Sequence, residues 1–145
     1  MLSILALVED TTSFDLMKMR KGIDILSEDS GVGDDVERGK WYEISLRMWL
    51  KRGDPILWVR PFGISNGRRV EDSQRLLTTR VRFHREYLFS GLFYGMEGMK
   101  VGGTRKLKIA PHLAYGAEGV NEMIPPNALL IVEVTLNKVL ETWSD

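Results

Sequence analysis

Two stretches of alternating apolar and polar residues, 104–111 and 129–139, constrain the fold more than any other feature of the chain. In TRKLKIAP, the apolar Leu107 and Ile109 alternate with lysines. In LLIVEVTLNKV, one set of alternate residues is uniformly apolar, namely Leu130, Val132, Val134 and Leu136. Successive side chains of a strand point to opposite faces of a sheet, so this period of two predicts two strands, each with one buried face.

The loop between these strands, AYGAEGVNEMIPPNA, is the second informative feature. Gly116 and Gly119 allow tight turns, and Pro125 with Pro126 stiffens the exit toward the last strand. Loops of this length inside a compact domain are usually functional or disordered, and the several apolar residues here argue against disorder. We therefore expect this loop to carry part of a site.

The earlier part of the chain predicts further strands. GKWYEISLRMWLKRGDPILWV has the pattern of a hairpin with a turn at 51–55, and TTRVRFHRE alternates with Val81 and Phe83 on one face. Asn66-Gly67 is the strongest hairpin-turn dipeptide of the sequence. FDLMKMRKGIDIL is a further candidate strand; LSILALVE fits a strand or a short buried helix, and we favour the strand.

Composition limits the class of protein. The chain has 145 residues, a formal net charge of zero and no cysteine, which fits one soluble domain without disulfides or thiolate metal sites. No nucleotide fingerprint, Ser/His/Asp set or paired carboxylates stand out, and Gly102-Gly103 is taken as a turn. The first residues lack the basic region of a signal peptide and are too few for a span, so we expect no membrane segment and a cytoplasmic protein.

The segment from Gly91 to Val139 resembles the FKBP-type peptidyl-prolyl cis-trans isomerases. The resemblance rests on a GMEGMKVGG-like helix region, the basic strand, AP-x-x-AYG, IPPNA-x-L and the terminal alternating strand. It implies an α+β fold in which a strongly twisted antiparallel β-sheet wraps around one short α-helix. The whole chain would form a single domain, with residues 1–20 as an N-terminal extension and the Arg-rich residues 58–86 as an enlarged hairpin segment.

The resemblance also implies a site. Tyr115 of AYG matches the tyrosine whose hydroxyl donates to a substrate carbonyl, and Ile124 matches an isoleucine whose backbone N–H binds another substrate carbonyl. Leu88, Phe89 and Met123 match apolar residues that line a proline pocket. These two groups would hold and surround an X-Pro bond.

Several positions depart from the family pattern. Leu92 stands where the family has a tryptophan floor, and Val132 stands for an aromatic residue of the last strand. Leu46 aligns with a tyrosine, and Ile56 with Leu57 aligns with a Phe-Asp pair. The pocket thus lacks rings that stack on proline and a carboxylate that orients it, which predicts reduced activity.

The predicted function is therefore isomerisation of X-Pro bonds in proline-containing polypeptides, with no cofactor and no metal. The alternative is a non-catalytic binding or chaperone-like module on the same fold. Seven arginines between Arg60 and Arg85 raise nucleic-acid binding as a third class. A solvated strand face explains them more simply, so no nucleic-acid partner is expected. The oligomeric state is left open.

Overall fold

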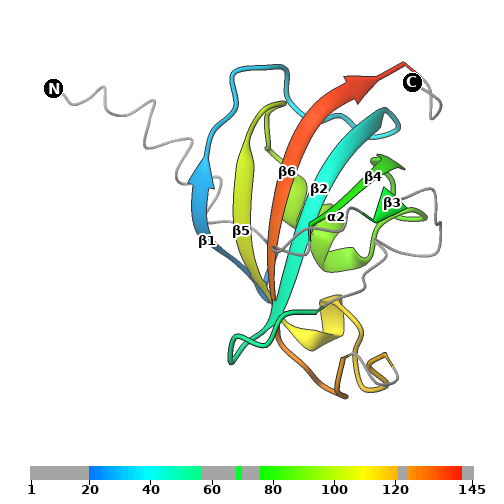
Figure 1. Cartoon of the computed structure of the whole chain (residues 1–145). Helices are drawn as coiled ribbons and strands as arrows, with labels where there is room; N and C mark the ends of the chain where they lie inside the picture. The colour runs from blue at the N-terminus through cyan, green and yellow to red at the C-terminus, as the bar shows by residue number, and fades with distance from the viewer. Residues whose placement is uncertain (1–19, 57–67, 70–75, 121–123, 142–145) are drawn as a thin grey trace, which may run out of the picture.

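The computed structural model of the chain describes residues 20–56, 68–69, 76–120 and 124–141 (Figure 1). Its elements, in chain order, are β1 (Ile23–Asp29), β2 (Trp41–Leu50), β3 (Arg68–Arg69), β4 (Leu77–Arg82), α2 (Ser90–Met96), β5 (Thr104–Ile109), the 3-10 turn η1 (Pro111–Leu113) and β6 (Leu130–Leu140). No helix in these ranges is both long and apolar enough to cross a membrane. The strand predicted within 1–20, the Asn66-Gly67 turn and most of the Arg-rich segment lie outside the described residues.

The strands form one antiparallel sheet in the order β1-β5-β6-β2-β4-β3. Figure 1 shows the long strands β5, β6 and β2 curving together, with α2 against one face of the sheet. This confirms the predicted α+β class and the antiparallel sheet with a short helix. The enlarged hairpin is represented by β3 and β4, which pair with each other at one edge.

The start of β1 differs from the prediction. The candidate strand FDLMKMRKGIDIL covers 14–26, whereas β1 begins at Ile23 and continues to Asp29. Its polar second half stays in the sheet because Asp29 pairs with Thr104 of β5, across a register shift between Ile25 and Ser27. An edge strand tolerates polar residues because only one of its sides is paired.

The concave face of the sheet carries the core. Leu130, Val132, Val134 and Leu136 of β6 are 0% exposed, as their alternation predicts. The register places Val134 opposite Leu46 and Val132 opposite Met48, so the inner residues of β2 and β6 meet on one face. Each aliphatic side chain buried in this way stabilises the fold by about 1.5–3 kcal/mol.

Helix α2 packs unusually close to β5. A Cβ added to Gly91 would lie 2.3 Å from Ile109 Cγ2, and one added to Gly95 would lie 2.6 Å from Leu107 Cδ1. Glycines one turn apart therefore let the helix backbone approach the strand. The helix ends before Gly98, whose φ of +87° is a conformation that glycine adopts without strain.

A buried arginine connects three elements beneath the helix. Arg105 of β5 is 1% exposed and lies on the inner face with Leu107 and Ile109. Its Nη1 donates to the carbonyls of Gly95 (2.8 Å) and Glu97 (2.7 Å), at the C-terminal end of α2. Its Nε donates to the Glu28 carboxylate of β1 at 2.9 Å.

This arginine was not recognised in the sequence. Burial lowers the pKa of Arg105, and the neighbouring Glu28 opposes that shift. Because carbonyls at a helix end carry partial negative charge, a guanidinium at this place compensates both them and the carboxylate. Arg105 thus fixes the end of α2 relative to β1 and β5.

Candidate active site

The loop that carries Tyr115 is held by its own backbone. After η1, the N–H groups of Ala114 and Gly116 both donate to the Pro111 carbonyl, at 3.0 and 2.8 Å. Farther along, Asn127 N–H donates to Gly116 O at 2.8 Å, which ties the exit of the loop to its start. The described part of the loop is therefore a folded unit at the end of the sheet that follows β5 and precedes β6 (Figure 1).

Tyr115 lies against the N-terminal end of α2. Its ring centroid is 5.2 Å from that of Phe89, with the two planes tilted by 45°. The side chain is half-buried, and this burial raises the pKa of Tyr115 to about 12. A tyrosine hydroxyl is protonated at neutral pH already at its ordinary pKa of about 10, so this side chain can donate a hydrogen bond.

Ile124 forms a two-way bridge with Val120. Ile124 N–H donates to Val120 O, and Val120 N–H donates to Ile124 O, each at 2.8 Å. The N–H predicted to bind a substrate carbonyl is thus already used within the loop. Binding of a substrate carbonyl by the Ile124 N–H requires this bridge to open, and this role stays a prediction.

Phe89 offers a backbone donor that sequence analysis missed. It precedes α2 in an extended conformation (φ −68°, ψ 157°), and no acceptor among the described residues takes its N–H. The first N–H groups of a helix have no partner inside the helix, so a free donor here is expected. The sequence signal for it is the Leu-Phe-Ser-Gly step into the helix, which marks the helix start.

The predicted apolar walls come together but lie below the surface. Leu46, Ile56, Leu88, Phe89, Leu92 and Val132 belong to one core cluster, and Tyr115 packs against it. Leu88, Leu92 and Val132 are 0% exposed. A prolyl ring could contact these three side chains only after the groups that cover them move. Met123 and Leu57 lie outside the described residues.

Three aromatic residues could replace the missing rings of the pocket, and two of them have other roles. Phe93 stacks on Phe83 with centroids 4.6 Å apart and is a core residue. The Arg20 guanidinium lies over the Tyr94 ring, with its central carbon 3.7 Å from the ring centroid. Trp58 lies outside the described residues. Phe93 and Tyr94 therefore do not form a floor beside Tyr115 in this structure.

The fold and the loop define an α+β domain in which a tyrosine-bearing loop packs against an apolar core. The sequence profile of the FKBP-type peptidyl-prolyl cis-trans isomerases matches residues 61–137. The chain is 35% identical over 120 residues to an FK506-binding protein of Neisseria meningitidis serogroup B, and the match covers 83% of this chain and 98% of that protein.

Two further matches show a longer relative and a solved structure. The chain is 50% identical over 52 residues to the 46 kDa FK506-binding nuclear protein of Spodoptera frugiperda, which is 36% of this chain and 13% of that protein. The N-terminal domain of FKBP42 from Arabidopsis thaliana has the same fold, with a TM-score of 0.62 at 21% identity, covering 84% of this chain and 89% of that one. The chain belongs to the family of FKBP-type peptidyl-prolyl cis-trans isomerases.

Proposed function

We propose that the chain isomerises X-Pro peptide bonds of polypeptides at the site between Tyr115 and Phe89. Membership of the family supports the reaction. The observation that carries the assignment to this place is the Tyr115 side chain, half-buried with its ring against Phe89 at the edge of the core. A hydrogen-bond donor in apolar surroundings can bind a peptide carbonyl without competition from water.

The reaction asks little covalent chemistry of the protein. Rotation about a peptide bond has a barrier of about 18–20 kcal/mol because the planar amide is stabilised by resonance. Resonance and its charge separation are lost in the twisted transition state, so an apolar site favours that state over the planar, more polar ground state. No nucleophile, metal or cofactor is needed for this step.

The described donors suggest how a substrate is held. The Tyr115 hydroxyl would donate to one carbonyl next to the proline. The Phe89 N–H, which has no acceptor among the described residues, would donate to a second one once the buried Phe89 backbone becomes accessible. Ile124 N–H could take this role only if its bridge to Val120 opened. Fixing the chain on both sides of the bond restricts rotation to the bond itself.

Reduced activity is part of the proposal. Leu92 occupies the place of the family's aromatic floor and is fully buried, so it offers no surface for stacking on a prolyl ring. Opening the apolar site would require side chains to move, which lowers the fraction of molecules competent to bind. We therefore expect slow catalysis, with weak binding of short peptides.

The test is a protease-coupled assay on a short X-Pro peptide. Tyr115→Phe removes one hydrogen bond, worth about 0.5–1.5 kcal/mol, and should lower kcat/KM by about three- to tenfold. Tyr94→Phe, which removes the hydroxyl of a tyrosine outside the site, serves as the matched control and should leave kcat/KM unchanged. Equal effects of the two substitutions would remove Tyr115 from the proposal.

The burial of Leu88, Leu92 and Val132 favours a second candidate, a binding module without catalysis. This candidate predicts no acceleration of isomerisation at high protein concentration, while a proline-containing peptide still shifts the amide NMR signals of the Tyr115 loop. Acceleration that is lost in Tyr115→Phe would exclude it.

A further inference from the structure

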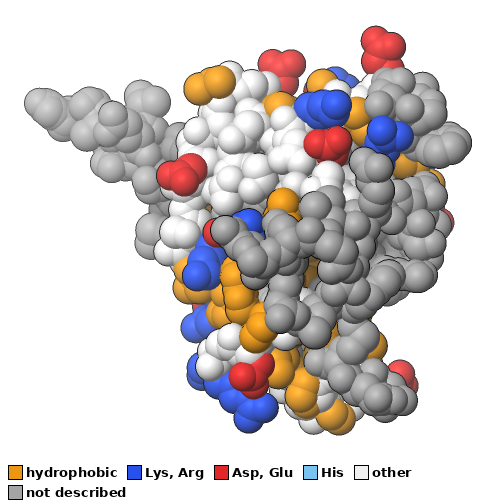
Figure 2. Space-filling model, viewed as in Figure 1, with side chains coloured by type: hydrophobic (Ala, Val, Ile, Leu, Met, Phe, Trp, Pro, Cys, Tyr) orange, Lys and Arg blue, Asp and Glu red, His pale blue; other side chains and the backbone are white. Residues whose placement is uncertain are grey.

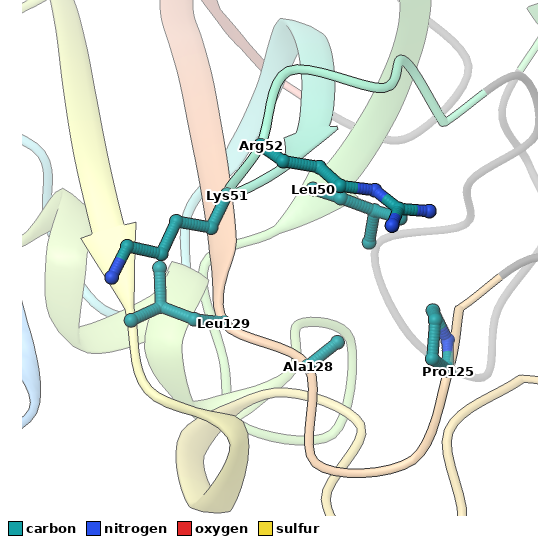
Figure 3. A pocket seen from close by; sticks show the side chains of 6 residues that line it. All are labelled: Leu50, Lys51, Arg52, Pro125, Ala128 and Leu129. Atoms are coloured by element: carbon teal, nitrogen blue, oxygen red, sulfur yellow. The ribbon is translucent and has the colours of Figure 1, made fainter.

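A hollow of about 430 Å³ lies at one end of the sheet, apart from the predicted site residues. Its lining comes from two segments, the turn after β2 and the stretch that enters β6 (Figure 3). In Figure 3, Leu50, Lys51 and Arg52 stand on one side, and Pro125, Ala128 and Leu129 stand on the other. Its volume lies within the range of ligand sites, about 300–1,000 Å³.

The floor of this groove is apolar. Leu50, Ala128 and Leu129 are half-buried, and Pro125 is exposed at its edge. Figure 2 shows hydrophobic side chains gathered on the lower part of the visible face, with Lys and Arg side chains, and Asp or Glu beside them, at the lower left. An apolar hollow with a few polar groups at its rim is the usual form of a recognition site.

The charge of the rim is positive. Among the described residues, the groove is lined by Lys51 and Arg52 and by no acidic residue. The Arg52 guanidinium is paired with the Asp54 carboxylate. Lys51 is exposed and has no anionic partner among the described residues. In Figure 3 the Lys51 side chain extends beside that of Leu129, so its ammonium is the positive charge that a group entering at this end of the groove would meet.

Two backbone N–H groups of the turn already have acceptors within the turn. Leu50 N–H donates to Asp54 O, and Gly53 N–H donates to Leu50 O, each at 2.8 Å. These two donors are occupied and cannot bind an added strand, and the groove also offers side chains for recognition. An apolar side chain suits the floor, and a carboxylate suits Lys51 better than a second cation does.

The groove is next to the proposed site along the chain. Pro125 follows Ile124 directly, and Asn127 N–H anchors this stretch to Gly116 of the Tyr115 loop. A polypeptide held at Tyr115 has chain on both sides of its proline. An extended segment covers about 3.3 Å per residue, so the residues that flank the proline extend along the protein surface away from Tyr115.

We propose that this groove, formed by Leu50, Lys51, Arg52, Pro125, Ala128 and Leu129, binds a segment of the client polypeptide that flanks the proline and carries an apolar residue next to an acidic one. The inference rests on the proposed function, because it takes the client to be a proline-containing polypeptide. Binding in the groove adds a preference for certain residues around the proline, which the prolyl site alone does not provide.

The test compares labelled peptides of about twelve residues, which reach roughly 40 Å when extended. Each holds one proline and a Leu-Glu pair placed two, three or four residues away on either side, and its matched partner has Leu-Lys. Fluorescence anisotropy should show that the best Leu-Glu peptide binds about two- to fivefold more tightly than its partner. Lys51→Glu should abolish or invert this preference. Lys138→Glu, at an exposed lysine far along β6, should preserve it.

The outcomes separate the groove from the reaction. Equal binding of every Leu-Glu and Leu-Lys pair, or equal effects of Lys51→Glu and Lys138→Glu, would overturn the groove. Isomerisation of a tetrapeptide, too short to carry the flanking segment, should not respond to Lys51→Glu. If the tetrapeptide is not isomerised while the Leu-Glu preference persists and depends on Lys51, the proposed reaction fails and the groove stands.

Discussion

Replacing Arg105 with methionine tests the most consequential polar contact of the core. Methionine keeps much of the apolar length of the side chain but removes the guanidinium. Two carbonyls at the end of α2, those of Gly95 and Glu97, then lose their donor, and the Glu28 carboxylate loses its counterion. Because Arg105 is 1% exposed, water cannot readily replace these contacts.

The expected loss is large for a single substitution. Each hydrogen bond from a charged group contributes about 1.5–3 kcal/mol, and removing one partner of a buried ion pair costs about 3–5 kcal/mol in total. Glu28 is partly solvated, with its side chain 20% exposed, which favours the lower half of that range. Arg105→Met should therefore reduce the free energy of unfolding by about 3–4 kcal/mol.

Urea unfolding followed by circular dichroism measures this quantity. With a slope of about 1–3 kcal/mol per molar urea, the midpoint should fall by roughly 1–4 M. A double-mutant cycle with Glu28→Gln should return a coupling of about 1–3 kcal/mol between the two side chains. Arg38→Met removes an exposed partner of Glu97 and should leave the midpoint nearly unchanged.

Two results would refute this account of Arg105. One is a loss below about 1 kcal/mol, which would mean that the guanidinium contributes no more than an exposed pair. The other is zero coupling with Glu28 despite a large loss, which would place the effect in the helix carbonyls alone. Since α2 follows directly from Phe89, a displaced helix should also lower kcat/KM of any isomerase activity.

The other predictions concern the helix packing and Tyr115. Gly91→Ala places a Cβ 2.3 Å from Ile109 Cγ2, so we expect a loss of about 1–3 kcal/mol in the same urea assay; an unchanged midpoint would contradict the close approach of α2 to β5. Burial raises the pKa of Tyr115 to about 12, above the unfolded value of about 10, so its stabilising contribution is complete below pH 10 and is lost as pH rises toward 12. Between pH 9 and pH 12, the unfolding free energy of the unchanged protein should fall by about 2–3 kcal/mol more than that of Tyr115→Phe. Identical pH profiles of the two proteins would contradict this prediction.

The sheet could be predicted because its strands follow a local rule. Tyr42, Ile44, Leu46 and Met48 alternate with less apolar residues, and all four are buried in β2. The same rule places Arg105 on the inner face, two residues before Leu107. Its burial depends on Glu28, which is far away in the sequence and meets β5 only through the sheet. A local pattern cannot supply such a partner.

The site was predictable in its parts but not in its hydrogen bonds. The AYG motif indicated Tyr115, and the structure packs its ring against that of Phe89, while the role of Tyr115 in a site stays a prediction. The N–H of Ile124 is taken by Val120 because a short bridge closes the loop, and nothing in the residue types specifies that pairing. The groove at Lys51 and Ala128 likewise arises where two segments meet that are separate in the sequence.

The central claim is that the loop carrying Tyr115 promotes rotation about X-Pro bonds. NMR exchange spectroscopy on a short X-Pro peptide measures the interconversion of its cis and trans forms directly, without a coupling protease. The account predicts that the exchange rate rises in proportion to the concentration of the protein, and that this increase falls about three- to tenfold in Tyr115→Phe but not in Tyr94→Phe. An exchange rate that stays at its uncatalysed value at every protein concentration would contradict it.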